Sequence, residues 1–241
     1  MNSSSKPKLK VDWVSHQAVD FSCKNWHYSK SVPVPPLVKI GAWEDGKFIG
    51  VILFSRGASK NLYKPYSLEQ TEGCELTRVA LRQHKTPVSK IMRHAIAFLK
   101  KKCPGLKLII SFADPNQGHH GGIYQAGNWL YAGKTAPSKQ YFDKNGKQWH
   151  PRMISVKGWT VVNGIKRKCL TPSQCTCIDT PGKHRYLYAL TTEMSAIIQP
   201  LAQPYPKRVK QATVDTLDKA AEHNRPTRSN SIENSRTEVN V

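Results

Sequence analysis

The sequence predicts an α/β (α+β) fold in which helices flank a single mixed, mostly antiparallel sheet. The central observation is a strand–helix–strand unit, in which apolar stretches at residues 73–82 and 106–113 bracket an amphipathic helix. Turn signals at residues 44–47 and 144–147, each ending in Gly-Lys, predict antiparallel hairpins on either side of that unit. The crossover helix allows its two strands to lie in one sheet, and the hairpins add antiparallel pairs to it.

The helix of the central unit is expected at residues 88–102. Its apolar positions recur at three- and four-residue spacing: Val88, Ile91, Met92, Ala95, Ile96, Phe98 and Leu99. Thr86 is a suitable N-cap, Pro87 suits the first helical position, and Pro104-Gly105 stops the helix. One face of this helix is therefore expected to be buried and the other to be basic.

Ahead of this unit, residues 1–10 are predicted to form a flexible basic arm, and residues 11–25 are compatible with a helix. A proline-rich loop follows, with Trp26, His27 and Tyr28 at its head. Apolar runs at 37–43 and 48–54 should pair as the first hairpin, and residues 55–71 are expected to be a loop.

After the second strand of the unit, Asp114-Pro115-Asn116 predicts a turn. A short helix is expected through residues 123–126, with Gly127 at its C-cap and a strand at 129–131. Further strands are predicted at 140–143 and 148–150, in short pieces within 153–168, and at 184–190.

The composition changes after residue 195, where prolines and polar residues replace large apolar ones. We therefore expect a folded domain over residues 11–195 and a basic, disordered tail over 196–241, with a transient helix at 214–222.

The charge of the chain indicates a polyanionic partner. Its 241 residues include 37 Lys and Arg against 16 Asp and Glu, a formal charge of +21, which exceeds what solubility requires. Nucleic acid is the favoured partner, and an anionic membrane surface is the alternative. No stretch approaches the roughly 18 apolar residues of a spanning helix, and the polar start of the chain lacks the apolar segment of a secretory signal. The cytoplasm is therefore expected.

Polar side chains cluster where the second strand of the central unit ends, which is the usual ligand position in such sheets. Asp114 is a candidate for orienting a base or binding a cation, and an Asx-turn cap is its alternative role. Tyr124 is a candidate acid or, alternatively, a packed core tyrosine. His27 and Tyr28 could stack on an extruded base or bind a metal, and a packed aromatic loop is their alternative.

A family resemblance rests on the stretch HHGGIYQAGNWLYAGKT, on Trp26-His27-Tyr28, on Asp114-Pro115 and on Lys183-His184-Arg185-Tyr186. Together with the order of elements, these residues resemble acetyltransferases of the GNAT type and, within them, the Mom proteins of Mu-like phages. The resemblance covers roughly residues 11 to 190.

The resemblance implies a phage enzyme of the host cytoplasm that converts adenine in double-stranded DNA to N6-carbamoylmethyladenine, which protects the DNA from restriction. It implies a catalytic set of Asp114, Tyr124, His27 and Tyr28, with Tyr124 protonating a leaving thiolate. It also hints at iron, for which His27, Tyr28, Asp114 and one of His119 or His120 offer ligands of the right type. Chemistry on a stacked base requires base flipping, with Tyr28 or Trp26 as the stacking partner.

The resemblance further implies acetyl-CoA or a related acyl donor, bound at the loop of residues 82–89. Thr86 and Val88 stand where the family pattern has glycines, so Arg82, Lys85 and Ser89 are the candidate cofactor-binding residues. Two other functions stay open: a CoA-dependent N-acetyltransferase acting on a protein or RNA amine, and a DNA-binding protein without catalysis.

Overall fold

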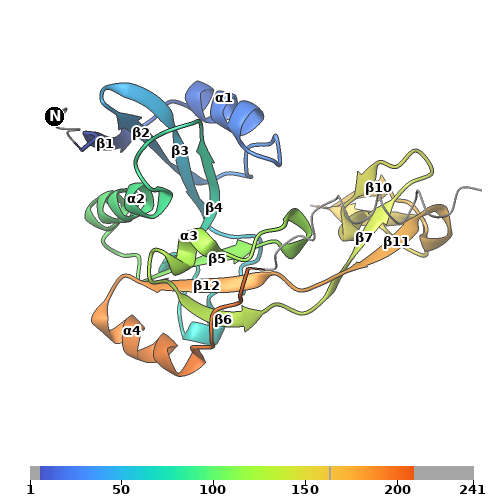
Figure 1. Cartoon of the computed structure of the whole chain (residues 1–241). Coiled ribbons are helices and arrows are strands. Elements are labelled where there is room, and N and C mark those ends of the chain that lie inside the picture. The colour runs from blue at the N-terminus through green and yellow to red at the C-terminus, as the bar shows by residue number, and fades with distance from the viewer. Residues whose placement is uncertain (1–5, 163, 209–241) are drawn as a thin grey trace, which may run out of the picture. The chain divides into compact units, whose positions relative to one another are not determined.

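The computed structural model describes residues 6–162 and 164–208 and contains a seven-stranded sheet (Figure 1). The strand order is β1 (Leu9–Trp13), β2 (Leu37–Glu44), β3 (Lys47–Ser55), β4 (Gly73–Leu81), β5 (Leu108–Ala113), β12 (His184–Ala189) and β6 (Leu130–Lys134). Neighbouring strands are antiparallel except β4 and β5, which are parallel. The predicted mixed, mostly antiparallel sheet with flanking helices is confirmed.

Helices cover both faces of this sheet. The helix α2 (Val88–Lys102) buries the apolar face that its periodicity predicts, against alternate residues of β3 such as Ile52 and Phe54. The intervening residues Val51 and Leu53 pack on the other face with α1 (His16–Trp26). On that second face, α4 (Thr192–Ile198) packs against β12. Among the described residues, no helix is both long and apolar enough to cross a bilayer.

The parallel strands β4 and β5 are paired only near the start of β4. Gly73, Cys74 and Glu75 pair with residues 108–110, and β4 then continues to Leu81 without β5 beside it. The separation of these strands leaves backbone groups that other parts of the chain must satisfy. It also places the ends of the central unit around the candidate site.

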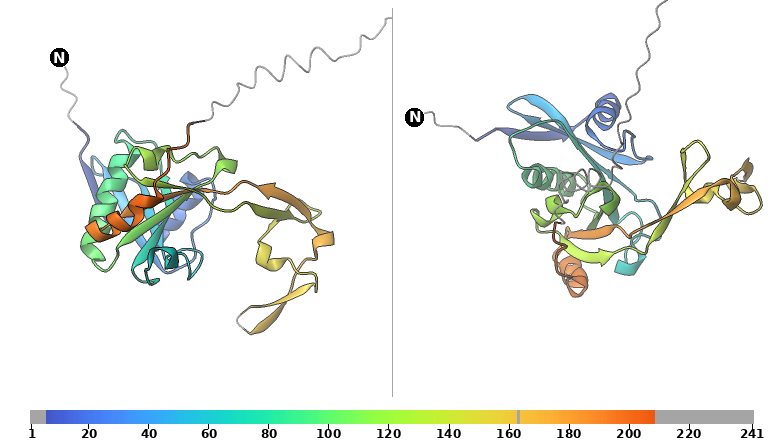
Figure 2. Two further views of the ribbon diagram at one scale, coloured as in Figure 1. Left: turned by 90° about the horizontal axis from the view of Figure 1, so that it is seen from below. Right: turned by 45° about the vertical axis from the view of Figure 1, so that its right-hand side comes forward.

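A segment between β6 and β12 forms two small sheets in addition to the predicted one. Strands β7 (Ser138–Phe142), β8 (Gln148–Trp149) and β11 (Thr176–Thr180) form one, and β9 (Trp159–Val162) and β10 (Ile165–Lys168) form a two-stranded ribbon. Figure 2 shows β7 and β11 as continuations of β6 and β12. The hairpin at 140–150 was predictable, whereas β11 was not, because four of its five residues are exposed and show no apolar alternation.

The predicted N-terminal boundary needs correction. Strand β1 begins at Leu9 and pairs with β2 along its whole length, so residues 9 and 10 belong to the sheet and not to an arm. After β1, Ser15 caps α1 by accepting a hydrogen bond from the backbone N–H of Ala18. The segment 11–25 is thus a strand end followed by a helix.

The predicted C-terminal boundary at residue 195 is also wrong. Helix α4 continues to Ile198, whose side chain is buried. Beyond it, the backbone N–H of Gln203 donates to the Tyr131 carbonyl (2.9 Å), and the Tyr205 hydroxyl donates to the Trp129 carbonyl (2.8 Å). The compact unit extends to Lys207. The helix expected at 214–222 lies outside the described residues.

Two predicted helix caps differ in the structure. The N-cap of α2 is Pro87, because the Thr86 side chain is engaged by Glu44 instead. The short helix α3 (Gly122–Gln125) has Ala126 as its C-cap, and Asn128 adopts the left-handed conformation (φ 56°) expected of Gly127. Asparagine tolerates that conformation better than most residues, so the turn is still made by a suitable side chain.

Candidate active site

Ser111 joins β5 to β4 just where the two strands separate. Its buried hydroxyl donates to the carbonyl of Leu76 (2.8 Å), the residue after the last paired position of β4. The same oxygen lies 2.7 Å from the hydroxyl oxygen of Tyr124. A serine hydroxyl has one proton and a carbonyl only accepts, so both contacts are satisfied when Tyr124 donates to Ser111.

Tyr124 projects from α3 into this junction and is buried between two aromatic rings. The ring centroids of Trp129 and Tyr186 lie 5.1 and 5.0 Å from that of Tyr124. Burial raises the pKa of Tyr124 to about 12. The phenol therefore holds its proton at neutral pH and can act as a proton donor.

Tyr186 fixes the loop that leads into α3. Its hydroxyl donates to the His120 carbonyl (2.6 Å) and accepts from the Gln125 side-chain amide (3.1 Å). A glycine is required at position 121, in the loop between His120 and α3, because its φ is 86° and a Cβ there would lie 2.2 Å from the Tyr186 ring. This arrangement sets the position of Tyr124, three residues further on.

Tyr28 forms an aromatic cluster with His27 and His119, and it lies within electrostatic range of Tyr124. Its ring packs on His27 with centroids 4.3 Å apart and against His119 with centroids 5.2 Å apart. Its negative charge, when ionised, contributes to the raised pKa of Tyr124. Tyr28 is 53% exposed. The structure thus brings Tyr28, His27 and His119 together.

His27 is a buried, neutral histidine. Its Nδ1 accepts a hydrogen bond from the backbone N–H of Ser29 (3.1 Å) and lies 2.8 Å from the Ser29 hydroxyl. Burial, followed by the charges of the nearby Arg78, His119 and Lys30, lowers the pKa of His27 to about 4. With Nδ1 as an acceptor, the neutral ring carries its proton on Nε2.

The depressed pKa of His27 predicts a pH dependence of stability. The unfolded state binds the proton below pH 6.5 and the folded state only below about 4, so the free energy of unfolding should fall across this range as pH is lowered. The contribution is at most about 3 kcal/mol. Urea titrations from pH 7 to 4 should show that the free energy of unfolding falls less steeply with pH in His27→Asn than in the wild type. The control is a substitution of an exposed histidine, His16→Asn. If the free energy of unfolding had the same pH dependence in all three proteins, His27 would not be the residue responsible.

Asp114 has the role of a turn cap in the structure. Its carboxylate accepts from the backbone N–H of Asn116 (3.0 Å) and forms an ion pair with Lys183 (2.9 Å). The geometry thus shows the Asx-turn alternative together with a cation at the site edge. Asp114 therefore orients the 114–121 loop.

The predicted iron centre does not fit these residues. Within residues 6–162 and 164–208, no three His, Cys, Asp or Glu side chains converge as metal ligands. The Nδ1 atom of His27 is occupied by Ser29, and the carboxylate of Asp114 is paired with Lys183. Of the two histidines considered, His119 contacts Tyr28, whereas His120 lies beside Gly122.

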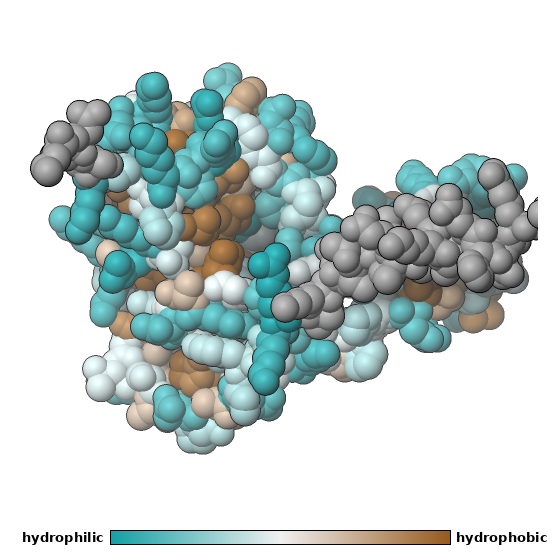
Figure 3. Space-filling model, in the orientation of Figure 1, coloured by the Kyte–Doolittle hydropathy of each residue, from teal (hydrophilic) through white to brown (hydrophobic). Residues whose placement is uncertain are grey.

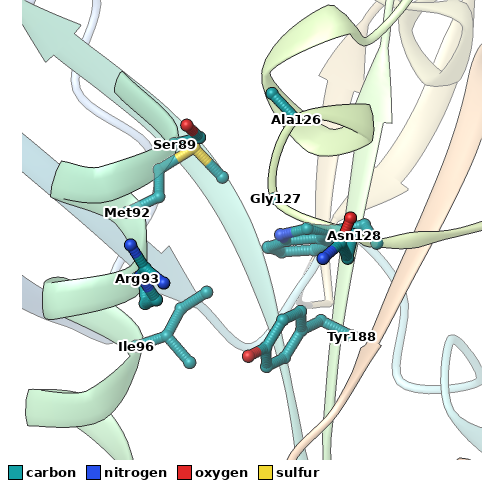
Figure 4. A pocket seen from close by; sticks show the side chains of 9 residues that line it. Ser89, Met92, Arg93, Ile96, Ala126, Gly127, Asn128 and Tyr188 are labelled. Atoms are coloured by element: carbon teal, nitrogen blue, oxygen red, sulfur yellow. The ribbon is translucent and has the colours of Figure 1, made fainter. Parts of the chain in front are cut away.

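A pocket of about 300 Å³ lies between α2 and the segment that follows α3. Ser89 and Arg93 line it from α2, and Asn128, Trp129 and Tyr188 line it from the other side (Figure 4). In the space-filling view, apolar residues gather in the middle of this face among polar ones (Figure 3). Ser89 was predicted here. Arg93 was missed, although its position one helical turn after Ser89 places both on the same face.

The other two predicted cofactor-binding residues are not in this pocket. The Arg82 guanidinium lies 6.0 Å from the centroid of the Trp26 ring. The backbone N–H of Lys85 donates to Glu44, and the Lys85 residue is exposed. Of the set Arg82, Lys85 and Ser89, the structure therefore keeps only Ser89 at the pocket, because the loop before α2 folds onto Glu44.

Comparisons with known proteins find acetyltransferases among the similar solved structures. An aminoglycoside acetyltransferase AAC(6')-Ib in complex with coenzyme A and kanamycin shares 8% identity, covering 78% of this chain and 98% of that one (TM-score 0.45). An IAA acetyltransferase from Bacillus cereus shares 14% sequence identity, and the match covers 76% of this chain and 100% of that one (TM-score 0.41). A variant of the spermidine N-acetyltransferase SpeG from Vibrio cholerae shares 10% sequence identity, and the match covers 80% of this chain and 97% of that one (TM-score 0.43).

No curated protein matches the sequence. The model of the Mom protein family, in contrast, matches residues 8–207. Because that match covers most of the chain, this protein belongs to the Mom family.

Proposed function

We propose that this protein is a phage DNA-modification enzyme that converts the N6 amine of adenine in duplex DNA to a carbamoylmethyl derivative in the host cytoplasm. The observation that carries the proposal is Tyr124, a buried and protonated phenol at the separation of β4 and β5, in a chain of the Mom family. Family membership supports the DNA substrate, and the phenol supports a transfer reaction that needs an acid.

In the proposed reaction, the adenine N6 forms a bond to the methylene carbon of the donor, and the bond from that carbon to the leaving group breaks. Tyr124 gives its proton to the leaving group, and the attacking amine releases one. The pocket between Ser89 and Asn128 is the proposed donor site, for a carbamoylmethyl donor whose methylene carbon carries the leaving group. Acetyl-CoA transfers an acetyl group through its carbonyl carbon, so it would serve only the acetyltransferase alternative. Asp114 and Tyr186 act as positioning residues, through the loop that carries α3.

Tyr28 is the proposed stacking partner of the flipped adenine. Its ring is half exposed and therefore available to a flipped base, and Tyr28 lies within electrostatic range of Tyr124. Trp26, the other candidate, packs against Phe21 and Phe48 with centroids 5.2 and 6.0 Å away. These contacts hold the partly buried Trp26 ring against other aromatic side chains.

The segment between β6 and β12 is the proposed DNA-binding surface. From residue 144 to 178 it contains no acidic residue and seven cations: Lys144, Lys147, Arg152, Lys157, Lys166, Arg167 and Lys168. On the ribbon, the Lys166 ammonium lies 4.3 Å from the centroid of the Trp159 ring, and that of Lys157 lies 5.7 Å away. A two-stranded ribbon of this kind fits the major groove of duplex DNA.

Removing ribbon charges should weaken DNA binding in a salt-dependent way. For Lys166→Gln combined with Lys168→Gln, the slope of log affinity against log salt should decrease by about 0.9 per lost phosphate contact. Fluorescence anisotropy with a short duplex measures this slope. The control is Lys60→Gln with Lys64→Gln, which removes the same charge from an exposed loop. Equal slopes in both double variants would contradict a ribbon-specific contact.

Restriction digestion tests the proposed function in cells. Plasmid from cells producing the protein should resist enzymes whose sites contain adenine and remain sensitive to enzymes whose sites lack it. Loss of this selectivity would contradict adenine modification. A DNA-binding protein without catalysis would leave purified plasmid fully sensitive, and an acetyltransferase acting on a protein or RNA amine would do the same.

A further inference from the structure

Glu44 binds the backbone of the loop that leads into α2. Its carboxylate accepts hydrogen bonds from the backbone N–H of Lys85 (2.9 Å), from the backbone N–H of Thr86 (2.7 Å) and from the Thr86 hydroxyl (2.6 Å). Both Glu44 and Thr86 are buried. These hydrogen bonds, led by that of the Thr86 hydroxyl, hold the pKa of Glu44 below its usual range. The side chain is therefore an ionised, fully engaged carboxylate.

A carboxylate held in this way uses the same donors as a phosphate. Successive backbone N–H groups in a loop bind phosphates and carboxylates by the same charge-assisted hydrogen bonds. A phosphate could reach the Lys85 and Thr86 amides only by displacing Glu44. The displaced carboxylate would then lie next to the incoming anion, and the like charges would repel each other.

The pocket beside α2 offers different groups to a ligand. Arg93 supplies a cation, Ser89 a hydroxyl and Asn128 an amide, around a volume of about 300 Å³. That volume is at the small end of the range for ligand pockets. It accommodates a small molecule with a carboxylate or carbonyl oxygen directed at Arg93.

We propose that Glu44 substitutes for a donor phosphate in the loop before α2, so that this enzyme uses a small donor held at Ser89 and Arg93 without a pyrophosphate contact to Lys85 and Thr86. The inference deepens the proposed function and rests on it, because only a transfer reaction has a donor. The occupation of the Lys85 and Thr86 amides by Glu44 does not depend on what the enzyme modifies.

Titration of the full chain with inorganic pyrophosphate tests the inference, with the backbone amides of Lys85 and Thr86 followed by nuclear magnetic resonance. In the wild type these two signals should not move in a saturable way. In Glu44→Ala, where the position is vacated, both should shift and saturate. Saturable shifts in the wild type, or none in a folded Glu44→Ala protein, would overturn the proposal.

A second measurement keeps the test decisive if Glu44→Ala does not fold. The wild type is titrated calorimetrically with coenzyme A and with pantetheine, which lacks the nucleotide and its phosphates. Affinities within about twofold of each other, or binding of neither, support the proposal, because RT ln 2 is only about 0.4 kcal/mol. Any larger preference for coenzyme A overturns it. Both readouts are binding measurements, so they stand even if the DNA proves to be unmodified.

Discussion

Replacing Tyr124 by phenylalanine is expected to lower the rate of adenine modification by about 10²- to 10⁴-fold, which is the usual contribution of a positioned general acid. Phenylalanine keeps the ring packing against Trp129 and Tyr186 and removes only the hydroxyl that carries the proton. Initial rates on duplex DNA, with quantification of the modified nucleoside, measure the effect.

The matched control for this prediction is Tyr63→Phe. Tyr63 is also a buried tyrosine whose hydroxyl makes one hydrogen bond, to the Arg56 carbonyl (3.1 Å), but it lies in a different core cluster. Both variants should unfold at similar temperatures, and only Tyr124→Phe should lose activity. A Tyr124→Phe protein with the wild-type rate would show that the phenol only packs the core.

Truncation after residue 195 is expected to destabilise the protein by about 4 kcal/mol, whereas truncation after residue 208 should leave its stability unchanged. The shorter chain loses the buried side chain of Ile198, for about 2 kcal/mol, and the hydrogen bonds of Gln203 and Tyr205, for about 1 kcal/mol each. Chemical denaturation of the two truncated proteins measures the difference. If the two truncated proteins were equally stable, the folded domain would end at residue 195, as the composition suggested.

The longer truncated chain also tests where DNA binds. Residues 209–241 contain as many cations as acidic residues, so this part of the tail is neutral and not basic as its composition first suggested. The five cations are Lys210, Lys219, Arg225, Arg228 and Arg236, and the five acidic residues are Asp215, Asp218, Glu222, Glu233 and Glu238. Its removal should leave the salt dependence of DNA binding unchanged, in contrast to the ribbon variant.

The central strand–helix–strand unit was predictable because its signals are local. The apolar face of α2 follows from side-chain spacing alone, and the buried residues Ile91, Ala95 and Leu99 are those that the spacing selects. The junction with Tyr124 was predictable in part, because β5, the turn and α3 follow one another in the chain. Its proximity to Tyr28 depended on how α1 packs on the sheet.

The features that the sequence did not reveal depend on contacts between distant residues. Glu44 and Thr86 are 42 positions apart, so the loop before α2 was interpreted from its own residues, and Thr86 was assigned as a cap. The role of Ser111 depends on where β4 and β5 stop pairing, which no local pattern encodes. The packing of Gln203 and Tyr205 was hidden by a proline-rich composition that is also typical of disorder.

The mass of the deoxyadenosine nucleosides in DNA from producing cells tests the central claim most directly. DNA from cells with the wild-type protein should contain deoxyadenosine heavier by one carbamoylmethyl group, and DNA from cells with an equal amount of folded Tyr124→Phe should contain almost none. Only unmodified deoxyadenosine in the presence of folded wild-type protein would contradict the account.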